Sequence, residues 1–171
     1  MSAKNKLSLT VQYADPSLAA SVTRALLRRW VQAALLAPAE LTLRFVDLNE
    51  GRALNRDYRG RDYATNVLTF AYPDEGHGND AEVDADADVV TDNDIPPTRA
   101  DIVLCCSVLM DEAAAQHKSL MAHAAHLVVH GVMHAQGYDH QNDAEAEEME
   151  ALEIEILAAL GFGNPYDAKK R

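Results

Sequence analysis

The chain has 171 residues, of which 48% are hydrophobic, and a formal net charge of −12 at pH 7. This length is enough to bury one sizeable core, so we expect one domain over residues 1–171. No apolar stretch approaches the roughly 18 residues of a membrane span, and no apolar signal segment opens the chain, so we expect a soluble cytoplasmic protein. The cysteines, Cys105 and Cys106, are adjacent and cannot join distant segments, and we interpret them as reduced core residues.

Much of the acidity lies in one segment. Nine acidic residues and no Lys or Arg occur between Asp74 and Asp94. A segment with low hydrophobicity and charge of one sign cannot repay the entropy of folding, so we predict a mobile acidic loop at about 74–99. Alternate aspartates at 84, 86 and 88 resemble the start of a calcium loop, but the glycine and glutamate needed later in such a loop are absent, which favours a solvated loop.

Hydrophobic patterns predict four strands. Residues 7–13 and 41–48 alternate apolar with polar side chains, as in half-buried strands. Residues 66–72 and 101–106 are short apolar runs of strand length, on either side of the acidic segment.

Helices are expected between and after these strands. Asp15 followed by Pro16 is typical of a helix start, and the predicted helix has an apolar stripe of Leu18, Val22, Leu26 and Trp30. Further helices are predicted at 49–58, at 107–136 with a break near 118–119, and from a cap at Asn142 to Gly161, the last with its glutamates on a solvated face. The expected fold class is α/β (α+β): about four strands in a mixed sheet packed against helices.

A histidine cluster gives the strongest functional signal. His130 and His134 lie within roughly 40° of each other on one helix face, Gly137 ends the helix, and the chain then turns back to deliver His140. Three histidine ligands that leave a fourth position open are typical of a catalytic zinc ion. We therefore predict one Zn²⁺, bound by His130, His134, His140 and water at the end of a central helix.

The residues around the histidines leave some alternatives open. Gly131 stands where an H-E-x-x-H peptidase places its glutamate base, which indicates a hydrolytic but not a proteolytic site. Glycine in a helix costs about 1 kcal/mol, and either room for substrate or close packing would explain it. Asp139 either supports a ligand imidazole or is an exposed turn residue. His126 is interpreted as a supporting or packing residue, and His123 is left undecided.

A second cluster precedes the third predicted strand and contains Arg52, Arg56, Arg59 and Arg61. These arginines are explained either by a solvated face paired with Glu50, Asp57 and Asp62 or by phosphate binding, for which the planar guanidinium is well suited.

The two clusters together resemble the YbeY endoribonuclease family. Residues 55–70, NRDYRGRDYATNVLTF, resemble the family pattern N-x-x-Y-R-x-x-D-x-x-T-D-V-L-S-F, and residues 130–140, HGVMHAQGYDH, resemble H-G-x-L-H-L-x-G-Y-D-H. The resemblance runs from about residue 41 to 162, with residues 100–103 matching a G-D-I-x strand. Departures are Asn66 for Asp, Thr69 for Ser, Met133 and Ala135 for Leu, and the acidic insertion, whose charge would repel an RNA backbone.

This resemblance implies a zinc-dependent, single-strand-specific endoribonuclease. Its implied roles are maturation of the 3′ end of small-subunit rRNA and ribosome quality control, with RNA and the ribosome or its small-subunit proteins as partners and neither DNA nor a membrane. By position, His130, His134 and His140 would bind the metal, and Arg59 would be the catalytic arginine. The metal would activate a water, although attack by the RNA 2′-hydroxyl stays open.

Two alternatives belong to other functional classes. The spacing of the three histidines equals that of metzincin zinc peptidases, although Gly131 replaces the glutamate. A non-enzymatic ribosome-assembly factor, in which zinc only fixes the turn, would tolerate loss of Arg59.

Overall fold

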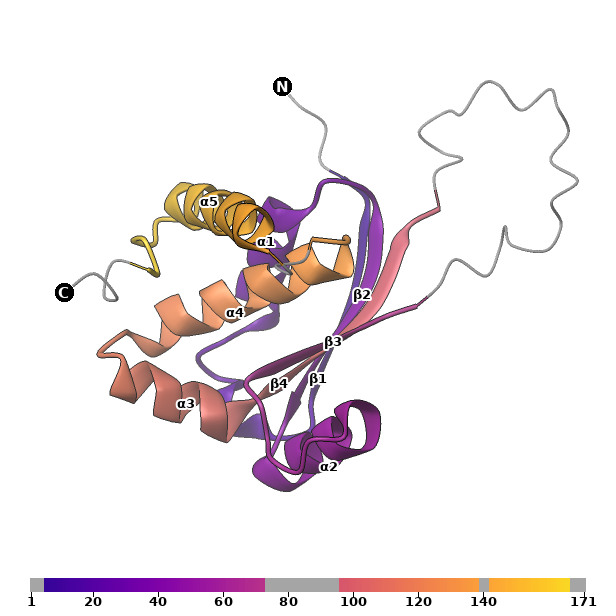
Figure 1. Ribbon diagram of the computed structural model, residues 1–171, viewed down its shortest axis with the longest axis vertical. Coiled ribbons are helices and arrows are strands. Elements are labelled where there is room, and N and C mark those ends of the chain that lie inside the picture. Colours follow the sequence, from indigo (N-terminus) through magenta and orange to yellow (C-terminus); the bar gives the residue numbers. More distant parts are fainter. Residues whose placement is uncertain (1–4, 73–95, 139–141, 167–171) are drawn as a thin grey trace, which may run out of the picture.

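The computed structural model describes residues 5–72, 96–138 and 142–166 (Figure 1). Most of the segment predicted as a mobile acidic loop, at about 74–99, lies outside the described residues. The described parts form one α+β domain, in agreement with the predicted fold class.

The sheet has four strands in the order β1-β2-β4-β3. Strand β1 (Leu7–Tyr13) pairs in parallel with β2 (Ala39–Val46), and β2 pairs in parallel with β4 (Thr98–Cys105). Strand β3 (Val67–Ala71) runs antiparallel to β4 at the edge of the sheet. The predicted mixed four-stranded sheet is therefore confirmed, and β4 begins three residues earlier than the apolar run indicated.

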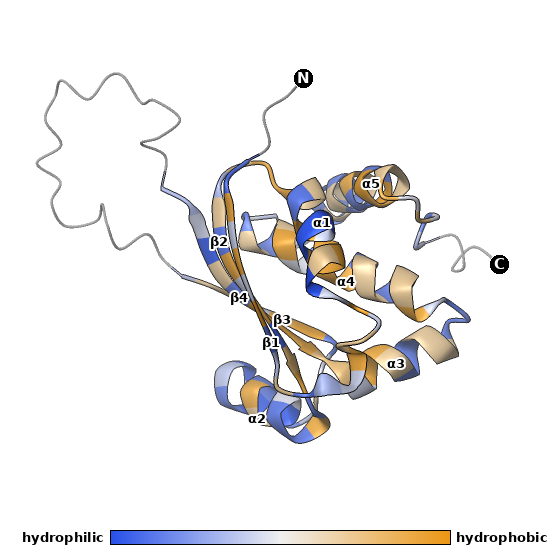
Figure 2. Cartoon of the chain, turned by 180° about the vertical axis from the view of Figure 1, so that it is seen from behind, coloured by the Kyte–Doolittle hydropathy of each residue, from blue (hydrophilic) through white to orange (hydrophobic). Residues whose placement is uncertain are grey.

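Five α-helices are described: α1 (Arg24–Ala34), α2 (Leu48–Arg59), α3 (Cys106–Ala115), α4 (Leu120–Ala135) and α5 (Asp143–Ala159). Helices α1, α3, α4 and α5 lie on one side of the sheet and α2 lies on the other (Figures 1 and 2). Across the described ranges, none of these helices is long and apolar enough to pass through a lipid bilayer.

The helix predicted to start at Pro16 is in fact two elements. Asp15 caps a single 3-10 turn (Pro16–Leu18) by accepting a hydrogen bond from the Ser17 amide at 2.9 Å. Thr23 then provides a second cap, because its Oγ1 accepts from the Leu26 amide at 3.3 Å and starts α1. Because α1 starts at this second cap, its side chains point in other directions than those of a helix that starts at Pro16. Leu27 and not Leu26 is therefore fully buried.

The main core lies between the sheet and α4. Alternate residues of β2, including Leu43 and Phe45, face this layer and are completely buried, as is Ile102 on β4. Helix α4 is the central helix, since ten of its sixteen residues are buried, and Ser119 caps its start. Cys105 and Cys106 are buried and unbridged, as predicted.

Candidate active site

His130 and His134 direct their Nε2 atoms toward each other from the last turns of α4, 2.9 Å apart. The other ring nitrogen of each histidine has an acceptor: His130 Nδ1 lies 2.6 Å from Glu153 Oε1, and His134 Nδ1 lies 2.9 Å from the Tyr138 carbonyl oxygen. These acceptors place the proton on Nδ1 in both rings, so the two Nε2 lone pairs face each other. A shared cation relieves that repulsion, and the donor set fits zinc.

The chain beyond α4 turns as predicted as far as it is described. Gly137 has a φ of +100°, and the Tyr138 amide donates to the Met133 carbonyl at 3.1 Å, which folds the chain back over the helix end. His140 and Asp139 lie outside the described residues. The assignment of His140 as the third ligand therefore stays a prediction.

Glu153 on α5 belongs to the candidate site, although the sequence did not predict it. Its side chain is completely buried, whereas the glutamates of this helix were predicted to be solvated. Met149, Glu153 and Leu157 follow one another at four-residue intervals and are the three buried residues of α5. The prediction was wrong for Glu153 because this residue lies on the buried stripe of the helix. Its spacing of four residues from Met149 and from Leu157 is the sequence signal that indicates this burial.

Three donors surround the Glu153 carboxylate. His130 Nδ1 donates at 2.6 Å, His126 Nε2 lies 3.0 Å away, and the Tyr166 hydroxyl also donates to it. Burial by itself raises the pKa of this carboxyl, but the hydrogen bonds from His126, His130 and Tyr166 outweigh it and lower the pKa to about 2. Glu153 is therefore ionised at neutral pH and holds the His130 ring in place, with His126 as a supporting residue.

His126, His130 and Glu153 also form a group that can hold a metal ion, since their ligand atoms lie within 4.8 Å of one another. Two ligands of one tetrahedral zinc ion stand roughly 3.3 Å apart. The 2.6 Å between His130 Nδ1 and Glu153 is shorter and typical of a charge-assisted hydrogen bond. The Nε2 atoms of His130 and His134 are 2.9 Å apart and would have to separate only slightly to bind the same ion. We therefore favour the Nε2 side of His130 as the metal-facing side.

His123, which the sequence left undecided, lies in the first turn of α4, three residues before His126. It is buried, and its Nε2 lies 3.0 Å from Glu112 Oε1. The Asn66 side chain donates to the same carboxylate at 3.0 Å. His123 therefore belongs to a structural contact between α3, α4 and the start of β3.

Arg59 differs from the neighbouring arginines. Ion pairs around α2 join Arg44 to Glu50 (2.6 Å), Arg52 to Asp62 (2.8 Å) and Arg56 to Asp57 (3.2 Å). The solvated-face interpretation is thus confirmed for Arg52 and Arg56. Arg59 is the last residue of α2, it is exposed, and it forms no ion pair within the described ranges. Its guanidinium is available to an anionic ligand.

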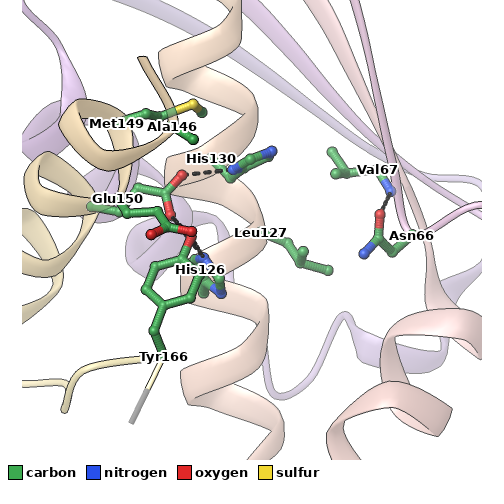
Figure 3. A pocket seen from close by; sticks show the side chains of 10 residues that line it. Asn66, Val67, His126, Leu127, His130, Ala146, Met149, Glu150 and Tyr166 are labelled. Atoms are coloured by element: carbon green, nitrogen blue, oxygen red, sulfur yellow. Dashed lines mark hydrogen bonds and ion pairs between the residues drawn. The ribbon is translucent and has the colours of Figure 1, made fainter. Parts of the chain in front are cut away.

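One cavity brings the two predicted clusters together. Arg59 from α2 and His130 and His134 from α4 line a cavity of about 830 Å³, whose floor includes β3. A smaller cavity of about 340 Å³ adjoins it and shares His130. Figure 3 shows this smaller cavity, with His126, Glu150 and Tyr166 on one side and Asn66 and Val67 on the other. In the larger cavity, Arg59 and His130 therefore face the same space although they lie 71 positions apart in the sequence.

Gly131 allows α4 to approach the sheet. A Cβ atom at this position would lie 2.8 Å from Ile102 Cγ2 on β4 and 3.5 Å from Thr69 and Val67 on β3. Of the two explanations for this glycine, the structure supports close packing. The direction of that Cβ also shows that a glutamate at position 131 would clash with the sheet.

Comparison with known proteins shows the family to which the chain belongs. The sequence model described as "Endoribonuclease YbeY" matches residues 6–161. The chain belongs to this family. YbeY proteins of Herminiimonas arsenicoxydans and Janthinobacterium sp. (strain Marseille), each named endoribonuclease YbeY, are 64% and 63% identical over 163 residues. The alignments cover 95% of this chain and 97% and 96% of those proteins.

The YbeY resemblance seen in the two motifs thus extends over nearly the whole chain. A Thermotoga maritima protein, TM1509, whose solution structure is known, matches over 95% of both chains with 18% identity and a TM-score of 0.49.

Proposed function

We propose that this protein is a zinc-dependent endoribonuclease that cleaves single-stranded RNA. The observation that carries the proposal is the single cavity lined by Arg59, His130 and His134. The family to which the chain belongs is named for endoribonuclease activity, which supports RNA as the substrate.

The proposed zinc ligands are His130, His134 and His140. When bound, zinc would supply Lewis acidity at the scissile phosphodiester and at the attacking oxygen. Glu153 keeps the His130 proton on Nδ1 and therefore keeps Nε2 available as a ligand atom. The Tyr138 carbonyl does the same for His134.

Arg59 is the proposed catalytic residue that α2 contributes to the cavity. Its guanidinium can donate two parallel hydrogen bonds to phosphate oxygens, and its charge would stabilise the negative charge that grows on them during phosphoryl transfer. Arg59 forms no ion pair with a carboxylate of the described ranges, so no ion pair within these ranges must break before it binds phosphate.

The proposed biological role follows from the family resemblance. We assign the protein to maturation of the 3′ end of small-subunit rRNA and to ribosome quality control in the cytoplasm, with the ribosome or small-subunit ribosomal proteins as partners. A zinc peptidase is disfavoured because Gly131 faces Ile102 and leaves no space for a glutamate base.

The proposal is tested by incubating zinc-loaded and chelator-treated protein with single-stranded RNA, duplex RNA and a peptide library. We expect cleavage of single-stranded RNA by the zinc-loaded protein only. Peptide cleavage would establish the peptidase alternative, and no cleavage of any substrate would favour the assembly factor. A 2′,3′-cyclic phosphate on the product would show attack by the 2′-hydroxyl, and a 5′-phosphate with a 3′-hydroxyl would show attack by water.

A further inference from the structure

An exposed aromatic side chain stands next to Arg59. Tyr58 is 69% exposed, the highest value among the large hydrophobic side chains of the described residues. It precedes Arg59 in the last turn of α2 and lines the same cavity as His130 and His134. Exposing so much aromatic surface gains nothing for folding, since the burial of apolar surface is what stabilises a folded chain.

The position of the Tyr58 ring is set by a second aromatic residue. Phe70 on β3 contacts it edge-to-face, with ring centroids 5.0 Å apart and planes at 63°. Phe70 is half-buried against the small core cluster under α2 and also lines the cavity. Helix α2 stops directly after Arg59, where Gly60 adopts a φ of +71°. The sheet and the helix end thus support Tyr58, while most of its surface stays exposed at the rim of the cavity that it lines.

We propose that Tyr58, supported by Phe70, forms a subsite that stacks an unpaired nucleobase of the RNA strand whose phosphate is bound by Arg59. This inference rests on the proposed function and names the feature of RNA that the site recognises. A nucleobase is the occupant that fits, because the aromatic ring lies one residue from a guanidinium without an ion-pair partner in the described ranges and shares its cavity. A nucleotide offers the matching pair, a flat π surface and an adjacent anion.

Such a subsite would explain a preference for single strands. In a duplex the bases are paired and stacked on one another, so their faces are not available to a protein side chain. An unpaired base exposes its faces, and stacking on an aromatic side chain contributes about 1–3 kcal/mol per base with little dependence on base identity. Tyr58 would therefore favour single-stranded over double-stranded RNA, with little preference for base sequence.

The test compares Tyr58→Ala, Tyr58→Phe and the control Tyr63→Ala. Tyr63 is also exposed, at 52%, and lies five residues away, but it does not line the cavity. The Kd for a fluorescent single-stranded RNA is measured by anisotropy on chelator-treated protein, and KM and kcat are measured on zinc-loaded protein. A stacking contribution of about 1–3 kcal/mol corresponds to a rise of roughly 5- to 150-fold in Kd and KM for Tyr58→Ala.

We expect kcat to change less than about two-fold in Tyr58→Ala, Tyr58→Phe to bind like the native protein, and Tyr63→Ala to bind normally. A strand with an abasic site at the stacked position should bind native protein and Tyr58→Ala equally. Unchanged affinity in Tyr58→Ala, equal loss in Tyr63→Ala, or no rescue by Phe would overturn the subsite. Native protein that binds RNA through Tyr58 but does not cleave it would overturn the proposed function and leave the subsite supported.

Discussion

The two sides of the proposed active site are built in opposite ways. On the α4 side, His130 is backed by α5 and the smaller cavity, where His126, His130 and Tyr166 all direct polar atoms at the buried carboxylate of Glu153. On the α2 and β3 side, Arg59 and Tyr58 are exposed. One side therefore uses hydrogen bonds within the protein to fix its geometry, and the other presents groups for a ligand.

This difference separates two tasks. A metal ligand must be held in one orientation and tautomer, which requires hydrogen-bond partners behind it. A group that binds phosphate or a base must exchange water for substrate, which is easier when no internal partner has to be displaced. Changes on the α4 side should therefore alter metal affinity, and changes on the α2 side should alter RNA cleavage without altering metal affinity.

The largest effect is expected from His134→Ala, which removes a proposed zinc ligand. Zinc affinity, measured by competition with a chromophoric chelator, should fall by more than about 100-fold. This exceeds the usual effect of removing a residue that is hydrogen-bonded to a metal ligand, because here the ligand itself is removed. RNA cleavage should become undetectable. Zinc affinity within a few-fold of the native value would show that His134 is not a ligand.

Arg59→Ala should lower kcat/KM for single-stranded RNA by about 1000-fold, the scale of arginine effects in phosphoryl transfer. Zinc affinity should not change. The matched control is Arg52→Ala, since Arg52 lies on the same helix but pairs with Asp62 and does not line the cavity. If Arg59→Ala cleaves RNA as fast as Arg52→Ala, the two sides of the cavity do not act together.

Glu153→Gln should weaken zinc binding by about 10- to 100-fold, because the carboxylate no longer holds the His130 ring. Binding of single-stranded RNA to chelator-treated protein should be unchanged, since Arg59 and Tyr58 are not affected. A loss of RNA affinity equal to the loss of zinc affinity would mean that the two sides are not independent.

The same carboxylate predicts a pH dependence of stability in the metal-free protein. Its pKa is lowered from 4.5 to about 2 in the folded chain, so the ionised form stabilises the fold above about pH 4.5. This contribution should be lost as the pH falls from about 4.5 toward 2. Urea unfolding between pH 7 and pH 3 should show a smaller decrease in the free energy of unfolding for Glu153→Gln than for native protein.

Gly131→Ala is expected to have the smallest effect. Overpacking against Ile102 costs about 1–3 kcal/mol, and the better helix propensity of alanine returns about 1 kcal/mol. The free energy of unfolding should therefore fall by up to about 2 kcal/mol. Gly163→Ala, where an added Cβ meets nothing within 4 Å, should change it by less than about 0.5 kcal/mol. Greater stability in Gly131→Ala would contradict the packing explanation.

The sequence predicted the four strands and most helices because each has a local signal. Alternation at Leu41 and Leu43 and the cap at Asn142 depend only on neighbouring residues, and the structure has the corresponding strand and helix. The prediction failed where a second local signal competed, as at Thr23, whose cap starts α1 eight residues after Pro16.

The candidate site was predictable only in part. His130 and His134 share a helix face, so their approach follows from their spacing. The contact between Glu153 and His130 depends on how α5 packs against α4, and the cavity shared with Arg59 depends on the strand order that places β3 beside β4. Local patterns carry no information on either arrangement.

The most direct test of the proposed active site is the cleavage of one end-labelled single-stranded RNA by zinc-loaded native protein, His134→Ala and Arg59→Ala, purified in parallel. We expect cleavage by the native protein that a chelator stops, at least about 1000-fold slower cleavage by Arg59→Ala, and none by His134→Ala. Equal cleavage by all three proteins would contradict it, because the activity would then come from neither side of this cavity.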